Sequence, residues 1–108
     1  MLRNLKCAEH IMATLKITHA DNEIIATLNG LIVYDRKTEN NPVLNDQVVL
    51  DPYLAAGINT LVVIGINWGG PAAFSGSVVV GNLDMPFSYG AAATPNGVAF
   101  TQSFAIPK

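Results

Sequence analysis

The amino-acid sequence predicts an all-β fold, an antiparallel β-sandwich of seven to eight short strands. Runs of alternating apolar and polar residues recur along the chain, and this period of two is typical of half-buried strands. Gly, Pro and Asn separate these runs, and no stretch predicts a helix longer than one or two turns. With 108 residues, half of them hydrophobic, the chain can bury one core but not two.

The first strands are expected around a tight hairpin. Ala13–His19 alternates between apolar and polar residues, and Glu23–Leu28 follows a turn signal at Ala20–Asn22. Asn29-Gly30 is the strongest short hairpin signal in a sequence. Leu31–Tyr34 is therefore expected to return antiparallel to the strand before it.

A polar stretch and one helical turn are expected next. Asp35–Asp46 is interpreted as a long loop with a short edge segment at Val43-Leu44, and Gln47–Leu50 as a short strand. In Asp51–Gly57, an Asp that can cap the turn, a Pro at its first position and a Gly at its end are typical of a single helical turn.

The strand Thr60–Asn67 is the one against which the others are expected to pack. Leu61 and Val63 would point to one side of the sheet, and Val62 and Ile64 to the other. A strand that is apolar on both faces is expected to be covered on both faces. The predicted buried residues are Leu28, Val49, Leu61 to Ile66, Val78, Phe100 and Phe104.

The C-terminal half is expected to contain three more segments. After a loop at Trp68–Ala72, residues Ala73–Val80 form a strand, and Met85–Tyr89 is a weak edge segment interrupted by Pro. Gly90–Gly97 is interpreted as a loop of small residues. Val98–Ile106 alternates well and is the predicted last strand.

The charges are concentrated in the first half of the chain. Between Pro52 and Pro107 the single charged residue is Asp84, which indicates that part of this half is buried against another copy or a partner. A surface of small neutral polar residues is the alternative. The net charge of −2 and the absence of clustered basic residues argue against nucleic acid as a partner. No apolar run reaches the length of a membrane span.

Residues 1–11 fit poorly with the strand pattern of the remaining chain and are expected to be an N-terminal tail or a non-native extension. The predicted β-sandwich domain is 12–108, and Met12 is an alternative start. No secretory signal is evident in the first residues, so the compartment is left open. Cys7 is the single cysteine, which excludes an internal disulfide and the usual structural zinc site.

Asn29-Gly30, Asp51–Leu54, Gly57–Asn59 and Leu61–Ile64 follow one another in an order and spacing that resemble the galactose-binding-domain-like jelly roll. This family comprises accessory β-sandwiches of glycoside hydrolases and related carbohydrate-active proteins. The resemblance covers about half of the chain and rests on mostly structural elements. It implies a carbohydrate ligand, and for a domain without a catalytic module it implies a lectin or an assembly subunit.

Trp68, the single tryptophan, is the residue that points most directly to a ligand. A sugar ring packs its C–H groups against an aromatic plane, while amide, carboxylate and guanidinium groups bond its hydroxyls. The alternative is that Trp68 closes one end of the sandwich or lies in an oligomer contact. The candidate carbohydrate-binding residues are Tyr34, Arg36, Asn40, Asn41, Asn67 and Trp68.

No catalytic function or cofactor is expected. His10 and His19 lack a Ser, Cys or acid at a recognisable spacing. The acids Asp35, Glu39, Asp46 and Asp51 offer the groups of a glycosidase pair, but they are interpreted as solvated. Structural calcium is a minor alternative, with oxygen ligands at 21–23 or at Asn82 and Asp84.

The sequence therefore predicts a non-enzymatic, lectin-like carbohydrate-binding domain that acts as a homo-oligomer. The interface is expected mainly within 68–106, where charge is lowest. The alternative is a structural or assembly protein of the same fold that uses this half for protein–protein contacts. A hydrolase whose site shows no motif is the third possibility.

Overall fold

A computed structural model of the chain describes residues 12–39 and 41–108. Every strand pair in this part is antiparallel, which confirms the predicted all-β antiparallel class. In chain order the elements are β1 (Ala13–Asp21), β2 (Glu23–Leu28), β3 (Leu31–Lys37), β4 (Val43–Val49), the 3-10 turn η1 (Asp51–Tyr53), β5 (Ile58–Val80) and β6 (Leu83–Pro107).

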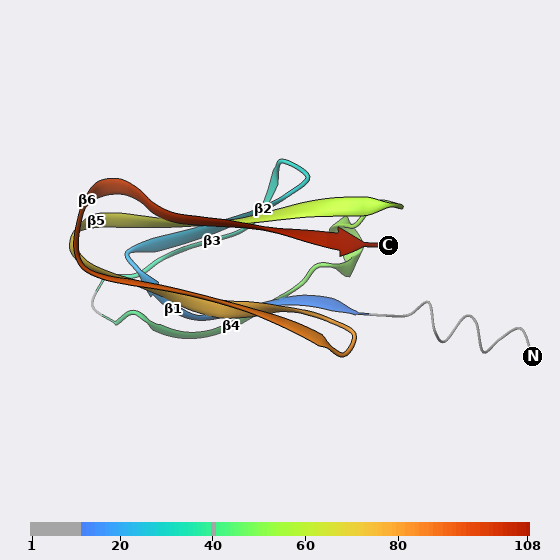
Figure 1. Cartoon of the computed structure of the whole chain (residues 1–108), viewed down its shortest axis with the longest axis horizontal. Helices are drawn as coiled ribbons and strands as arrows, with labels where there is room; N and C mark the ends of the chain where they lie inside the picture. Colours follow the sequence, from blue (N-terminus) through green and yellow to red (C-terminus); the bar gives the residue numbers. More distant parts are fainter. Residues whose placement is uncertain (1–11, 40) are drawn as a thin grey trace, which may run out of the picture.

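The strands form one sheet that is folded over on itself. Along the sheet the order is β3-β2-β5-β1-β4, and β6 pairs with β5. The first part of β5 pairs with β2 and its last part pairs with β1, while β6 accompanies it along both parts. Figure 1 shows the result, two facing layers that β5 and β6 both run through. One layer contains β2 and β3, and the other contains β1 and β4.

The predicted count of seven to eight strands is wrong, because the described residues form six. The segments 68–72 and 90–97, expected as loops, lie inside β5 and β6. They pair with each other, as at Trp68 opposite Asn96, so the ladder continues around the bend. Gly69 and Gly70 have φ values of 101° and 79°, which favour glycine and let the strand turn sharply.

The predicted loop at 35–46 is also mostly strand. β3 extends to Lys37, which pairs with Glu23, and β4 begins at Val43, which pairs with His19. Both ends extend because an inner strand lies beside them, and its backbone groups would otherwise lack partners. Backbone pairing with the inner strands therefore determines the structure of these residues, although their side chains are polar.

The helical turn at Asp51–Tyr53 exists, but Asp51 does not cap it. Its Oδ1 atom accepts a hydrogen bond of 2.8 Å from the backbone N–H of Ala13, so the side chain ties the turn to the start of β1. Pro52 lies in the first positions of the turn, as expected.

The Asn29-Gly30 turn is confirmed, and its Asn also joins the hairpin to β5. Both residues have positive φ, 52° and 85°, which matches the mirror-image turn of tight hairpins. The side chain of Asn29 donates to Asn59 Oδ1 at 2.8 Å and accepts from the N–H of Thr60 at 2.9 Å. Asn59 is fully buried and bonds backbone carbonyls of Ala55 and Ile106. These motif residues therefore have structural roles.

The core lies between the two layers, on the concave face of the folded sheet. Its largest fully buried apolar side chains are Phe74, Leu15, Ile17, Ile24, Leu28, Leu50, Leu61, Ile106, Val63 and Val78. The prediction for Val49 is wrong, since this side chain is 45% exposed. Val62, Ile64 and Ile66 are only partly buried, because they point to the convex face, which no second layer covers.

Five aromatic rings close one side of the space between the layers. Phe87 and Tyr89 come from the first half of β6, and Phe100 from its second half. The ring of Phe100 lies 5.6 Å from that of Tyr89, 5.9 Å from that of Phe87 and 6.1 Å from that of Phe74. Phe104 contacts Phe87 in turn. The two halves of β6 are therefore held together through their side chains as well as through the bend.

Replacing Gly76 with Ala should destabilise the fold. An added Cβ would lie 2.1 Å from the backbone oxygen of Lys16 and 2.8 Å from the ring of Phe87, and we expect a loss of at least about 2 kcal/mol in the free energy of unfolding. Gly90→Ala is the matched control, because its Cβ would have 3.9 Å of clearance and should change stability by about 0.5 kcal/mol at most. Urea denaturation measures both, and equal stabilities of the two variants would contradict the packing.

Candidate functional site

The bend in β5 places two of the predicted binding residues next to each other with opposite orientations. Asn67 is fully buried, and its Nδ2 atom donates to the backbone oxygen of Gly70 at 2.9 Å and to Thr94 Oγ1 at 2.5 Å. Trp68 points outward and is 47% exposed. The alternation of a strand thus makes Asn67 the internal support of the bend and Trp68 its external side chain.

The backbone at Trp68 is fixed by Asn22, the residue between β1 and β2. Its N–H donates to Asn22 Oδ1 at 2.7 Å, and the N–H of Asn22 donates to the carbonyl of Ile66 at 2.9 Å. Thr38 in turn donates through its N–H to the carbonyl of Asn22 at 2.7 Å and through its hydroxyl to that of Ala20 at 2.6 Å. The bend therefore has little freedom to move, although its surface is open.

Asn96 completes the outer face of the bend. It is exposed and pairs directly with Trp68 across the ladder. Directly opposed residues of an antiparallel pair project to the same face, with Cβ atoms about 5 Å apart. An indole ring and an amide group therefore lie side by side at this end of the molecule.

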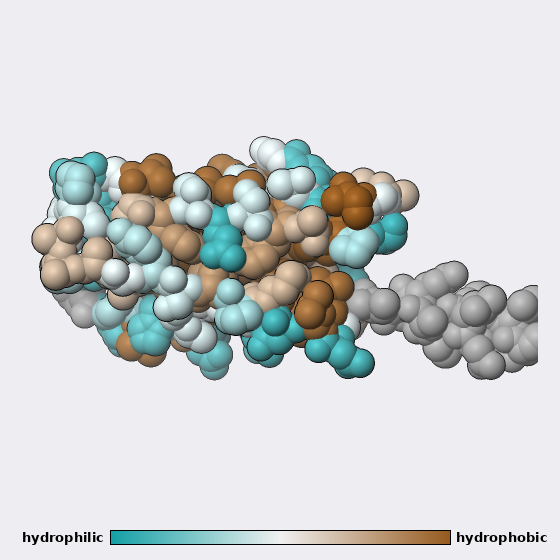
Figure 2. Space-filling view, viewed as in Figure 1, coloured by the Kyte–Doolittle hydropathy of each residue, from teal (hydrophilic) through white to brown (hydrophobic). Residues whose placement is uncertain are grey.

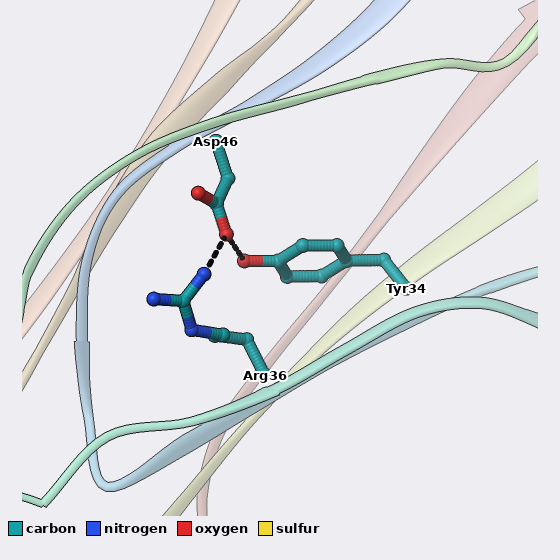
Figure 3. Close-up of polar contacts among 3 residues, drawn as sticks. All are labelled: Tyr34, Arg36 and Asp46. Atoms are coloured by element: carbon teal, nitrogen blue, oxygen red, sulfur yellow. Dashed lines mark hydrogen bonds and ion pairs between the residues drawn. The ribbon is translucent and has the colours of Figure 1, made fainter.

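Tyr34 and Arg36 meet at a different place, on the open side between β3 and β4. Figure 3 shows both side chains directed at Asp46. The hydroxyl of Tyr34 donates to Asp46 Oδ2 at 2.5 Å, and a terminal nitrogen of Arg36 donates to the same oxygen at 2.9 Å. These contacts join the edge strands of the two layers, so Tyr34, Arg36 and Asp46 form a polar bridge.

The polar bridge keeps the phenol of Tyr34 neutral. Burial raises the pKa of Tyr34 above its ordinary value of 10.0, and the hydrogen bond to Asp46 and the charge of that carboxylate raise it further. Arg36 acts in the opposite direction but more weakly. The Arg36–Asp46 ion pair is partly exposed, at 48% and 25% of the side chains, and contributes about 0–1 kcal/mol. The bridge therefore stabilises mainly through the tyrosine hydroxyl.

The structure groups the predicted site residues in two places and leaves the others apart. Asn67 and Trp68 lie at the bend, and Tyr34 and Arg36 lie in the polar bridge. Asn41 accepts a hydrogen bond of 3.0 Å from the N–H of Val43 and shapes the turn before β4. Asn40 and the N-terminal segment 1–11 lie outside the described residues.

A carboxyl pair, with Glu23 buried and Asp35 exposed, was missed from the sequence. Glu23 is buried on β2 beside Asp35 of the neighbouring strand. The neighbouring carboxyl group of Asp35 raises the pKa of Glu23, and burial raises it further, while the charge of Lys37 lowers it. Residues two apart in the register share a face, but the sequence placed Asp35 in a loop, so this contact could not be found there.

A serine–histidine contact was also missed. Ser75 Oγ lies 2.9 Å from His19 Nδ1 and 2.7 Å from Thr18 Oγ1, between β5 and β1. No carboxylate among the described residues is hydrogen-bonded to His19, so the group that orients the base in a catalytic triad is missing from this contact. Within residues 12–39 and 41–108, no three His, Cys, Asp or Glu side chains gather as metal ligands.

Comparisons with protein-family models, curated proteins and solved structures found no match to this chain. No helix in the described part of the chain is long and apolar enough to cross a membrane. The functional interpretation therefore rests on the bend, the polar bridge and the exposed strand edges.

Replacing Glu23 with Gln should remove a pH-dependent loss of stability. Because the folded-state pKa of Glu23 is raised above 4.5, folding favours its protonated form, and this contribution is lost as the pH rises through the folded-state pKa. The stability of Glu23→Gln relative to wild type should therefore rise between about pH 4 and about pH 8. Urea denaturation across this range, with the exposed Glu39→Gln as control, measures the difference. A constant difference would contradict the assignment.

Replacing Tyr34 with Phe should weaken the closure between β3 and β4. The change removes one hydrogen bond to a carboxylate, and we expect a loss of about 1–2 kcal/mol in the free energy of unfolding. Tyr89→Phe is the matched control, because the Tyr89 hydroxyl makes no hydrogen bond within the described residues. Equal effects of the two changes would show that the polar bridge does not stabilise the fold.

Proposed function

We propose that the chain is a non-enzymatic carbohydrate-binding domain of lectin type, with Trp68 as the surface on which the sugar ring packs. The observation that carries this proposal is the 47% exposure of Trp68 on a bend whose backbone is fixed by Asn22. An exposed indole on a rigid support binds with little ordering of the protein, which reduces the entropic cost of association.

The neighbours of Trp68 suit the polar part of a sugar. Asn96 lies on the same face, and an amide group both donates to and accepts from hydroxyl groups. The proposal gives Asn67 the role of holding the bend rather than of touching the ligand. Tyr34 and Arg36 are bonded to Asp46 and would form a separate polar surface.

The resemblance to the galactose-binding-domain-like jelly roll is part of the proposal. Its motif residues Asn29, Gly30 and Asn59 join the hairpin to β5, so they support a shared framework rather than a shared ligand site. We propose that this framework belongs to a jelly-roll sandwich in which β5 and β6 continue through the bend.

Replacing Trp68 with Ala should strongly weaken sugar binding. A glycan array with the full chain at high concentration identifies the best neutral sugar, and titration of the intrinsic fluorescence follows binding, because Trp68 is the single tryptophan. We expect millimolar affinity for one site. On the array, Trp68→Ala should weaken retention by at least about tenfold, which corresponds to about 1.4 kcal/mol.

Tyr53→Ala is the matched control for this experiment. Tyr53 is exposed to the same extent as Trp68, 47%, but belongs to η1, away from the bend. Its replacement should leave retention unchanged. Absence of binding to every glycan, or an equal loss in both variants, would contradict the proposal.

A second candidate function is assembly, with this chain as a structural subunit. The observation that favours it is β6, a strand of 25 residues that pairs on one edge with β5 and contains one charged residue, Asp84. A long uncharged edge is a template for pairing with another strand.

A further inference from the structure

β6 differs from the other edge strands in how its free edge is protected. β3 and β4 also lie at edges of the sheet, but they contain Asp35, Arg36, Lys37 and Asp46, and charges discourage pairing with another strand. β6 runs along the near side of Figure 1, and the middle of that side is covered mainly by tan and pale residues in Figure 2. Its free edge is therefore nearly neutral.

The last hydrogen-bonded pair of the ladder shows which N–H and C=O groups of β6 point to β5 and which point to the free edge. Gly57 and Lys108 exchange both backbone hydrogen bonds, at 3.0 and 2.8 Å. Such pairs alternate along an antiparallel ladder with pairs whose N–H and C=O groups point away from the partner. The register is unbroken from Pro107 back to Phe100. The residues whose N–H and C=O groups point to the free edge are therefore Thr101, Ser103 and Ala105.

The rest of the free edge is interrupted by a charge, prolines and a bulge. Pro86 has no N–H to offer, and Asp84, two residues earlier, places a charge on the same edge. Pro95 lies in the bend. The register shifts between Phe100 and Val98, so Ala99 has no partner on β5 and forms a bulge. Pro107 ends the strand and has no backbone N–H to donate. These protective features flank 100–106 and leave that window open.

We propose that a second copy of this chain occupies the window, with residues 100–106 of the two copies pairing antiparallel about a two-fold axis at Ser103. Ser103 then faces Ser103 of the other copy, and Thr101 faces Ala105. All three residues are exposed in the single chain, small and neutral, so no charge opposes the approach. This inference names the partner and interface of the assembly function, on which it rests, and it is independent of carbohydrate binding.

The features at the two ends of the window favour this register between the copies. With the axis at Ser103, the bulge residue Ala99 of one copy lies opposite Pro107 of the other. The ladder therefore ends at both limits together, and each outward residue finds an outward partner. On the concave face the partly buried Phe100 packs beside Ile106 of the other copy, and Gln102 beside Phe104. A two-fold contact of this kind is self-complementary and closes at a dimer.

The mass of the full chain in solution tests the interface. Light scattering after size exclusion at micromolar concentration should give about twice the 11.5 kDa of one chain. Ser103→Lys places two like charges opposite each other and should raise the dissociation constant at least about tenfold. Ser88→Lys, at an exposed position in the first half of β6 and outside the window, should leave the dimer intact. Mixing Ser103→Lys with Ser103→Glu should restore a dimer, which also shows that both variants fold.

Three results would overturn the inference: a wild-type mass of one chain, a Ser103→Lys dimer as tight as that of Ser88→Lys, or no recovery on mixing. Sugar binding by monomeric Ser103→Lys is followed separately through Trp68 fluorescence. Loss of binding to glycans with an intact dimer contradicts the carbohydrate proposal alone. A wild-type chain that is monomeric and binds sugar contradicts the assembly function and this interface alone.

Discussion

The bend shared by β5 and β6 is the constraint on which the rest of the structure depends. Two strands of 23 and 25 residues stay paired while they turn from one layer into the other. Because the same two strands run through both layers, their bend sets how the layers face each other. Asn67 holds the inside of the turn through Gly70 and Thr94. A single buried amide therefore supports the geometry that places the core between the layers.

Folding a sheet over leaves two open sides, and the chain closes them with different chemistry. Where the two halves of β6 face each other, stacked aromatic rings fill the gap. Where β3 and β4 face each other, the polar bridge of Tyr34, Arg36 and Asp46 spans it. The polar side carries charges that protect its edges, whereas the aromatic side leaves a neutral edge. This asymmetry separates the two proposed functions, with the sugar at the bend and the second copy at the β6 edge.

Sequence patterns predicted the local elements well where a turn or an alternation dictates backbone geometry. The Asn29-Gly30 hairpin, the turn at Asp51–Tyr53 and the alternation of 61–63 were all found. The predictions for the Gly- and Pro-rich segments 68–72 and 90–97 were wrong. Each segment has the composition of a loop, but the two pair with each other and form strand. Pairing between distant segments is a tertiary effect that local composition does not report.

The candidate site was predictable to a similar degree. The exposure of Trp68 results from its position one residue after the inward-facing Asn67 on β5, whereas the sequence placed Trp68 in a loop. The hydrogen bond between Tyr34 and Asp46 could not be predicted from the sequence, because it joins strands in different layers. Val49 was expected in the core from its hydrophobicity, but β4 is an edge strand and one of its faces meets water.

The continuity of the β5–β6 ladder through the bend is the central claim of this account, and nuclear Overhauser contacts between the two backbones measure it directly. The account predicts cross-strand contacts along the whole ladder. The ladder begins with the pair Ile58 and Pro107 and ends with the pair Val80 and Leu83. These contacts should include the pair Trp68 and Asn96 at the bend. Two separate series of contacts, with none between 67–73 and 90–97, would show independent short strands joined by loops and would contradict it.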